Sequence, residues 1–194
     1  MAPDIEIIQD CVAGIVSAAP QLGPHAAGTL SAVRASWSRA GLPEKRLSSA
    51  ARHSIASSAM SFAASAYAAL ADDPESMRIV GRLMKHAAGI DGEPSGRHTR
   101  KRGYAPAGEW QGPDGGPWTR VERNSWSLVL FHTPGMPGGD WTVAVGNAPC
   151  LYGQDPEEVD ARTVAMLESV DSALRAGAIR RRVQAWPRPG AGTA

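Results

Sequence analysis

The chain has 194 residues, of which 43% are hydrophobic, and its formal net charge is +1. This length allows one medium domain or two small ones, and the hydrophobic content excludes a wholly disordered chain. A nearly neutral chain also lacks the strong overall positive charge typical of nonspecific nucleic-acid binding. The abundance of alanine, glycine, proline and arginine suggests a GC-rich bacterial or phage genome.

The sequence predicts a cytoplasmic protein with no membrane partner. Asp4 and Glu6 make the N-terminus acidic, where a secretory signal peptide needs a basic start. No run approaches the ~18 apolar residues of a membrane span. Cys11 and Cys150 are expected to be free thiols rather than a disulfide, because the chain has no dense cysteine framework.

The first 90 residues have the periodicity of helices. Apolar residues recur every three or four positions over 5–19 and 26–37, and glycine or proline follows both stretches. The sequence Asp-Pro-Glu from Asp73 predicts a capped helix start, and we expect that helix to end near Gly89.

The stretch from Ser48 to Leu70 consists almost entirely of alanine and serine. Small side chains let neighbouring helices approach closely, so we expect a central helix packed between others. The alternative is a face for self-association. Arg52, His53 and the many serines argue against a lipid-facing helix.

Periodicity is lost over residues 91–116, where glycine and proline are dense. A loop of this length inside a compact domain is uncommon, so the stretch is predicted to be a linker or a mobile arm. The period then becomes two, which predicts strands at 118–123, 126–131 and 141–146. The second of these is apolar on both faces and is expected to be central.

The last predicted element is a long helix. It begins with a cap and proline at Asp155 and Pro156, and Gly177 is expected to end it. Together these elements predict an α+β fold. Its expected organisation is a helical segment at 1–90, a linker or arm at 91–116, an antiparallel sheet of about three strands with a long helix at 117–180, and a disordered basic Pro/Gly tail at 181–194.

The sequence contains no established catalytic or metal-binding motif. The weak catalytic candidates are His132 at the end of the central strand, Asp140 at the start of its partner, and Cys150 further on. A regular hairpin would place His132 opposite Asp140, and Cys150 would complete a hydrolase-like arrangement. Polar residues at strand ends are ordinary, however, so we expect no catalytic site, no metal and no cofactor.

Two basic runs have two interpretations. They could converge into a nucleic-acid interface, formed by Arg97, Arg100, Lys101, Arg102, Arg180, Arg181 and Arg182. They could instead be solvated, or neutralised by residues 103–179, which hold 4 basic and 10 acidic side chains. We favour the second interpretation.

The leading functional hypothesis is therefore a non-enzymatic accessory or regulatory protein that contacts a partner protein or a second copy of itself. A nucleic-acid-binding regulator is the alternative, and a hydrolase-like enzyme is the third hypothesis.

The linker hypothesis predicts the pattern of limited proteolysis. Residues 91–116 should be the main sensitive region, because nothing there can bury an apolar face. Trypsin should cut first near Arg97 to Arg102, as mass spectrometry of the early fragments would show. Early cleavage between Ser48 and Leu70 would contradict the predicted organisation.

Overall fold

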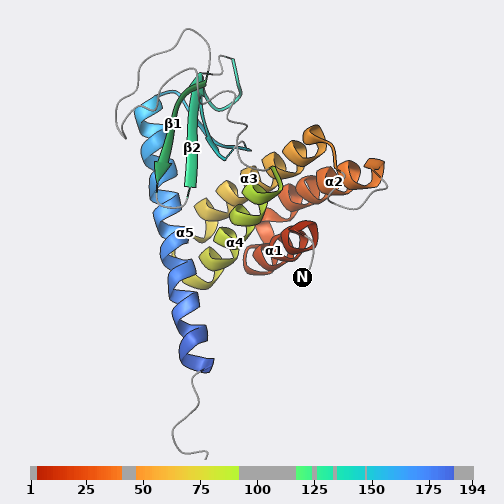
Figure 1. Cartoon of the computed structure of the whole chain (residues 1–194), viewed down its shortest axis with the longest axis vertical. Helices are drawn as coiled ribbons and strands as arrows, with labels where there is room; N and C mark the ends of the chain where they lie inside the picture. Colours follow the sequence, from red (N-terminus) through yellow and green to blue (C-terminus); the bar gives the residue numbers. More distant parts are fainter. Residues whose placement is uncertain are drawn as a thin grey trace, which may run out of the picture.

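Helices and an antiparallel sheet share one body in the computed structural model, which has the α+β fold expected from the sequence (Figure 1). The structure describes residues 4–40, 47–91, 117–123, 126–132, 135–146 and 148–185. The N-terminal helices are α1 Asp4–Ala18, the short 3-10 helix η1 Pro20–Leu22, α2 Gly23–Ala40, α3 Ser49–Leu70 and α4 Pro74–Asp91. None of the described helices is long and apolar enough to cross a membrane.

Side chains cap the starts of α3 and α4, and the cap at Asp73 is the one that the sequence predicts. The Asp73 carboxylate accepts bonds from the backbone N–H groups of Glu75 and Ser76, both at 3.2 Å, and from the Ser76 hydroxyl. These bonds, the hydroxyl's above all, lower the pKa of Asp73. Ser48 caps α3 in the same way, because its hydroxyl accepts a bond from the Ala51 N–H.

Helix α3 lies in the middle of the helical half, as its small side chains predicted. It packs against α2 on one side and α4 on another, while α1 packs against α4. Eight of its side chains are buried, and five of them are alanines: Ile55, Ala56, Ala59, Met60, Phe62, Ala63, Ala64 and Ala66. Among the larger buried side chains, the Phe62 ring makes a T-shaped contact with the ring of His25 on α2.

The sheet has four strands in the order β1-β2-β3-β4, and all neighbours are antiparallel. The strands are β1 Pro117–Arg123, β2 Trp126–His132, β3 Trp141–Val145 and β4 Ala148–Gly153. β2 lies in the interior of the sheet, as predicted. β4 was not predicted, because Pro149 and Gly153 are poor strand residues, yet an edge strand tolerates both.

Helix α5, Pro156–Ala185, is longer than the sequence predicted. Its start is capped as expected, since the Asp155 carboxylate accepts the N–H groups of Glu157 and Glu158. The predicted end at Gly177 is wrong, because α5 continues to Ala185, inside the stretch 181–194 that the sequence predicts to be a disordered tail. A Cβ atom at Gly177 would lie 2.5 Å from Cδ of Arg78, so this glycine makes room for a neighbouring side chain rather than ending the helix.

A single hydrophobic core joins the helices to the sheet. α5 packs along α4 and across the sheet, and β4 packs on α3. At the junction, the Trp126 indole N–H donates a 3.0 Å bond to the Asp171 carboxylate, and the Lys85 ammonium lies 5.7 Å from the Trp126 ring centre. Trp126 of β2 thus contacts both α4 and α5.

The close packing of α3 gives a stability prediction. Ala63 and Ala66 are fully buried, whereas Ala68 and Ala69 are exposed on the same helix. Ala63→Leu or Ala66→Leu should lower the free energy of unfolding by about 1–3 kcal/mol, because the added atoms have no space. The exposed controls Ala68→Leu and Ala69→Leu should change it little in urea denaturation. Equal effects at buried and exposed positions would contradict the close packing.

Candidate functional site on helix α2

The sheet register does not assemble the hydrolase-like arrangement. The backbone of His132 pairs with Trp141, which in turn pairs with Gly153. Cys150 is three residues away from Gly153 in β4, which is about 10 Å along the strand. β4 is also two strands away from β2, the strand that contains His132. The side chain of His132 lies outside the described part of the structure.

Asp140 has a structural partner in the tip between β2 and β3. Its carboxylate accepts the N–H of Gly135 at 3.0 Å. The tip packs tightly on the end of β4, since a Cβ atom at Gly139 would lie 2.1 Å from the carbonyl oxygen of Gly153. Gly139 also has a φ of 138°, which L side chains rarely adopt. Asp140 therefore helps to hold a turn that needs glycine.

Cys150 is poorly suited to act as a nucleophile. Only 3% of its surface is exposed, and burial raises the pKa of its thiol to about 12, from an ordinary 9.0. The reactive form is the thiolate, which is scarce near neutral pH at such a pKa. Burial also raises the pKa of Cys11, and both cysteines are free thiols, as predicted.

The two basic runs are only partly described. Arg97, Arg100, Lys101 and Arg102 lie outside the described residues. Arg180, Arg181 and Arg182 belong to the last turns of α5, where the backbone is described. Cations near a helix C-terminus interact favourably with the helix dipole. The described residues also contain no group of three His, Cys, Asp or Glu side chains that could hold a metal ion.

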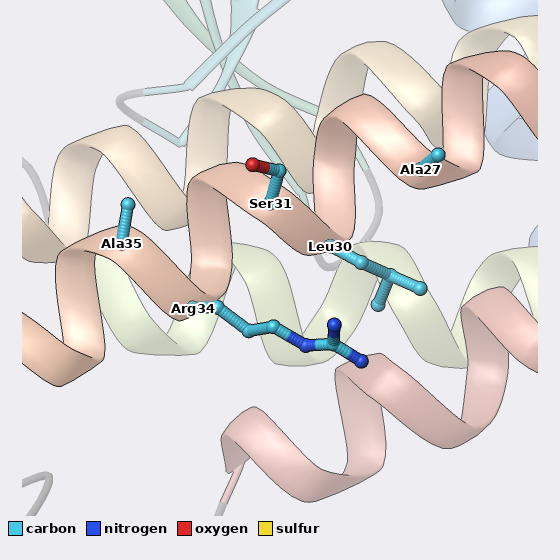
Figure 2. Close-up of a pocket in the computed structure, with 5 residues that line it drawn as sticks. All are labelled: Ala27, Leu30, Ser31, Arg34 and Ala35. Atoms are coloured by element: carbon cyan, nitrogen blue, oxygen red, sulfur yellow. The ribbon is translucent and has the colours of Figure 1, made fainter.

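An open hollow of about 510 Å³ lies along α2 (Figure 2). Its described lining residues are Ala27, Leu30, Ser31, Arg34 and Ala35. Ala27, Ser31 and Ala35 have small side chains and are spaced four residues apart, so they share one face of the helix. In Figure 2 the Leu30 and Arg34 side chains extend from α2 on the side of α1.

One face of α2 packs against the rest of the helical bundle, and the hollow lies on its opposite, solvent-facing side. Ala26 and Val33 are buried, and the Thr29 hydroxyl donates a 3.5 Å bond to the carbonyl of Ser58 on α3. Ala27, Ser31 and Arg34 are exposed. Helix α2 therefore offers solvent a row of small side chains beside a guanidinium, a surface suited to close contact with another helix that carries a carboxylate.

Sequence reasoning did not single out this hollow. The spacing of Ala27, Ser31 and Ala35 is visible in the sequence, but α3 has the same kind of spacing on its buried face. Only the packing of the other helices shows which row of small residues remains exposed.

Comparisons with known proteins give no relative. No family model matches the chain, and neither the curated proteins nor the solved structures contain a match. The functional argument therefore depends on the geometry of this chain.

Because the thiol of Cys150 is buried, the free energy of unfolding should fall as the pH rises into the alkaline range. Below pH 9 the thiol is protonated in both the folded and unfolded chain. Between pH 9 and about 12, the unfolded chain releases this proton while the folded chain keeps it, so stability falls as pH rises. This loss should approach about 1.4 kcal/mol per pH unit above pH 9.

Urea denaturation at several pH values would measure the effect. Cys150→Ala should remove this part of the alkaline loss, whereas Cys11→Ala should leave the contribution of Cys150 in place. Parallel stability curves for wild type and Cys150→Ala above pH 9 would contradict the raised pKa.

Proposed function

We propose that this protein is a non-enzymatic accessory or regulatory protein that acts in the cytoplasm by binding another protein. The observation that carries the proposal is the open hollow on α2, where small side chains and Arg34 face solvent. The proposed occupant is a helix of the partner protein, with small or apolar residues on the contacting face and an Asp or Glu opposite Arg34.

Helix packing explains why small residues favour such an occupant. Two helices approach most closely where their facing side chains are small, and the ridges of one then fit the grooves of the other. Ala27, Ser31 and Ala35 form a shallow row of this kind. A partner helix in this row would contact the backbone of α2 without displacing any residue of the core.

Charge explains why the partner helix should be acidic rather than another copy of α2. The sequence of α2 contains Arg34 and Arg39 but no Asp or Glu. Two α2 helices packed face to face would bring cations together, and like charges in an interface are unfavourable. A carboxylate on the partner would instead form a charge-assisted hydrogen bond with the Arg34 guanidinium.

Site-specific crosslinking tests this proposal. A photo-crosslinking amino acid in place of Ser31, in cells of the source organism, should give one adduct of defined mass. The matched control is the same amino acid in place of Ala165, which is exposed on α5. Mass spectrometry of the adduct should place the linked residue in an acidic helix of the partner.

Charge reversal at Arg34 makes the test specific. Arg34→Glu should reduce the adduct about tenfold or more, because it places like charges together. Arg34→Lys should retain most of it. An adduct of equal yield from Ala165, or one insensitive to Arg34→Glu, would contradict the proposal. An adduct with twice the mass of the chain would show self-association and exclude the acidic partner helix.

A further inference from the structure

The sulfur-containing side chains of the described residues differ sharply in exposure. Met136, in the tip between β2 and β3, is 43% exposed. The other described methionines and both cysteines are at most 3% exposed: Met60, Met77, Met84, Met166, Cys11 and Cys150. Among the described residues, Met136 is therefore the one that presents a sulfur-containing side chain to solvent without any opening of the fold.

The backbone that carries Met136 is held in a defined turn. The Gly139 N–H donates a 3.1 Å bond to the Met136 carbonyl, and this bond closes a turn with Pro137 second and Gly138 third. Gly138 has a φ of 116°, and a proline followed by a glycine of positive φ is typical of a type II turn. The bond to Asp140 and the packing on β4, described above, hold the same tip. A reaction at the Met136 side chain therefore need not disturb the backbone.

The buried methionines are parts of the hydrophobic core. They come from α3, α4 and α5, and all belong to the same cluster of buried side chains: Met60, Met77, Met84 and Met166. Methionine sulfoxide is polar, so its formation there would place a polar group without a partner in an apolar environment. These side chains should react only in molecules that have opened locally.

The two cysteines are protected in a further way. The reactive form of cysteine is the thiolate, and burial raises the pKa of the Cys11 and Cys150 thiols. Methionine reacts as a neutral thioether, so it does not have to lose a proton first. Near neutral pH the Met136 side chain is therefore both accessible and in its reactive form, whereas the two thiols are neither.

We propose that Met136 is a site of reversible oxidation by peroxides, which convert its thioether to a sulfoxide while the fold stays intact. A lone pair of the Met136 Sδ attacks one peroxide oxygen, the S–O bond forms, and the O–O bond breaks. The sulfur loses two electrons, and hydrogen peroxide is reduced to water after proton transfer to the leaving oxygen. Methionine sulfoxide reductases reverse the change. The sulfoxide oxygen then leaves as water while two thiols are oxidised to a disulfide.

Oxidation changes the chemical character of the tip. Met136 is the large hydrophobic side chain that is exposed among the described residues, and its sulfoxide is polar and chiral. Its neighbours Gly135, Pro137 and Gly138 add little apolar surface, so the tip is too small for an apolar docking patch. The site is separate from the α2 hollow and does not require the proposed protein partner.

Mass spectrometry of the full chain after brief treatment with dilute hydrogen peroxide at neutral pH tests the proposal. Trypsin releases residues 124–162 as one peptide, in which Met136 is the one methionine. Met136 should be oxidised at least about tenfold faster than the four buried methionines, because these wait for local opening. In urea all five should react at similar rates, which would show that the fold causes the difference.

Two variants locate the added oxygen. Met136→Leu should abolish the rapid gain of oxygen in this peptide, although Trp126, Trp141 and Cys150 are still present in it. Met84→Leu is the matched control, because it replaces a buried methionine with a residue of similar volume. It should leave the rate of oxidation at Met136 unchanged.

Two further measurements address the fold and the reversal. Circular dichroism and urea denaturation of the protein oxidised at Met136 should match those of the untreated protein. The two methionine sulfoxide reductases, one for each epimer, should return the peptide to its original mass when they are supplied with a dithiol.

Three outcomes would overturn the proposal. The first is that Met136 reacts no faster than the buried methionines in the native protein. The second is that Cys11 or Cys150 is oxidised before Met136. The third is that oxidation at Met136 unfolds the chain or is not reversed by the reductases.

Discussion

The structure depends on the close approach of neighbouring elements to α3. Ala56, Ala59 and Ala63 are fully buried, and their side chains end at Cβ, so α2, α4 and β4 can all pack near the helix backbone. Dispersion between closely packed atoms is individually weak but adds up over such a contact. The contribution of α3 therefore comes from the small size of its buried side chains as well as from their apolar character. A helix of larger residues would push α4 away, and with it the surface on which α5 rests.

The junction of sheet and helices adds a directional contact to this packing. Asp171 is 7% exposed, and a buried carboxylate without a partner would be costly. The indole N–H of Trp126 satisfies it and thereby fixes the position of β2 along α5. Lys85 covers the same ring from α4. The apolar core holds the two halves together, whereas this polar contact determines how they are aligned.

Local chemistry made much of the fold predictable. Asp73 and Asp155 cap their helices through hydrogen bonds to residues two or three positions ahead, which the sequence alone can show. The apolar pattern that predicts β2 likewise reflects the burial of that strand's own side chains. β4 was missed because Pro149 and Gly153 are poor strand residues. Its pairing is also irregular, since the register shifts opposite Val143 and Ala144.

The sites were harder to predict, because they depend on contacts between segments that are distant in sequence. The register that pairs His132 with Trp141, and the burial of Cys150, follow from how the strands and helices meet. The same is true of the exposed row on α2, which differs from the buried row on α3 only in its neighbours. Gly177 lies inside α5 and makes room for Arg78, which is about a hundred positions earlier in the sequence.

The position of α5 has a consequence for synthesis of the chain on the ribosome. Helix α4 is made well before α5, yet Gly81 and its neighbours on α4 are covered by Val170 and Leu174. Trp126 likewise lacks its carboxylate partner until Asp171 has been made. During translation the nascent chain therefore exposes an apolar face of the bundle and one face of the sheet. Such transient surfaces are prone to aggregation and are the kind that molecular chaperones cover until folding is complete.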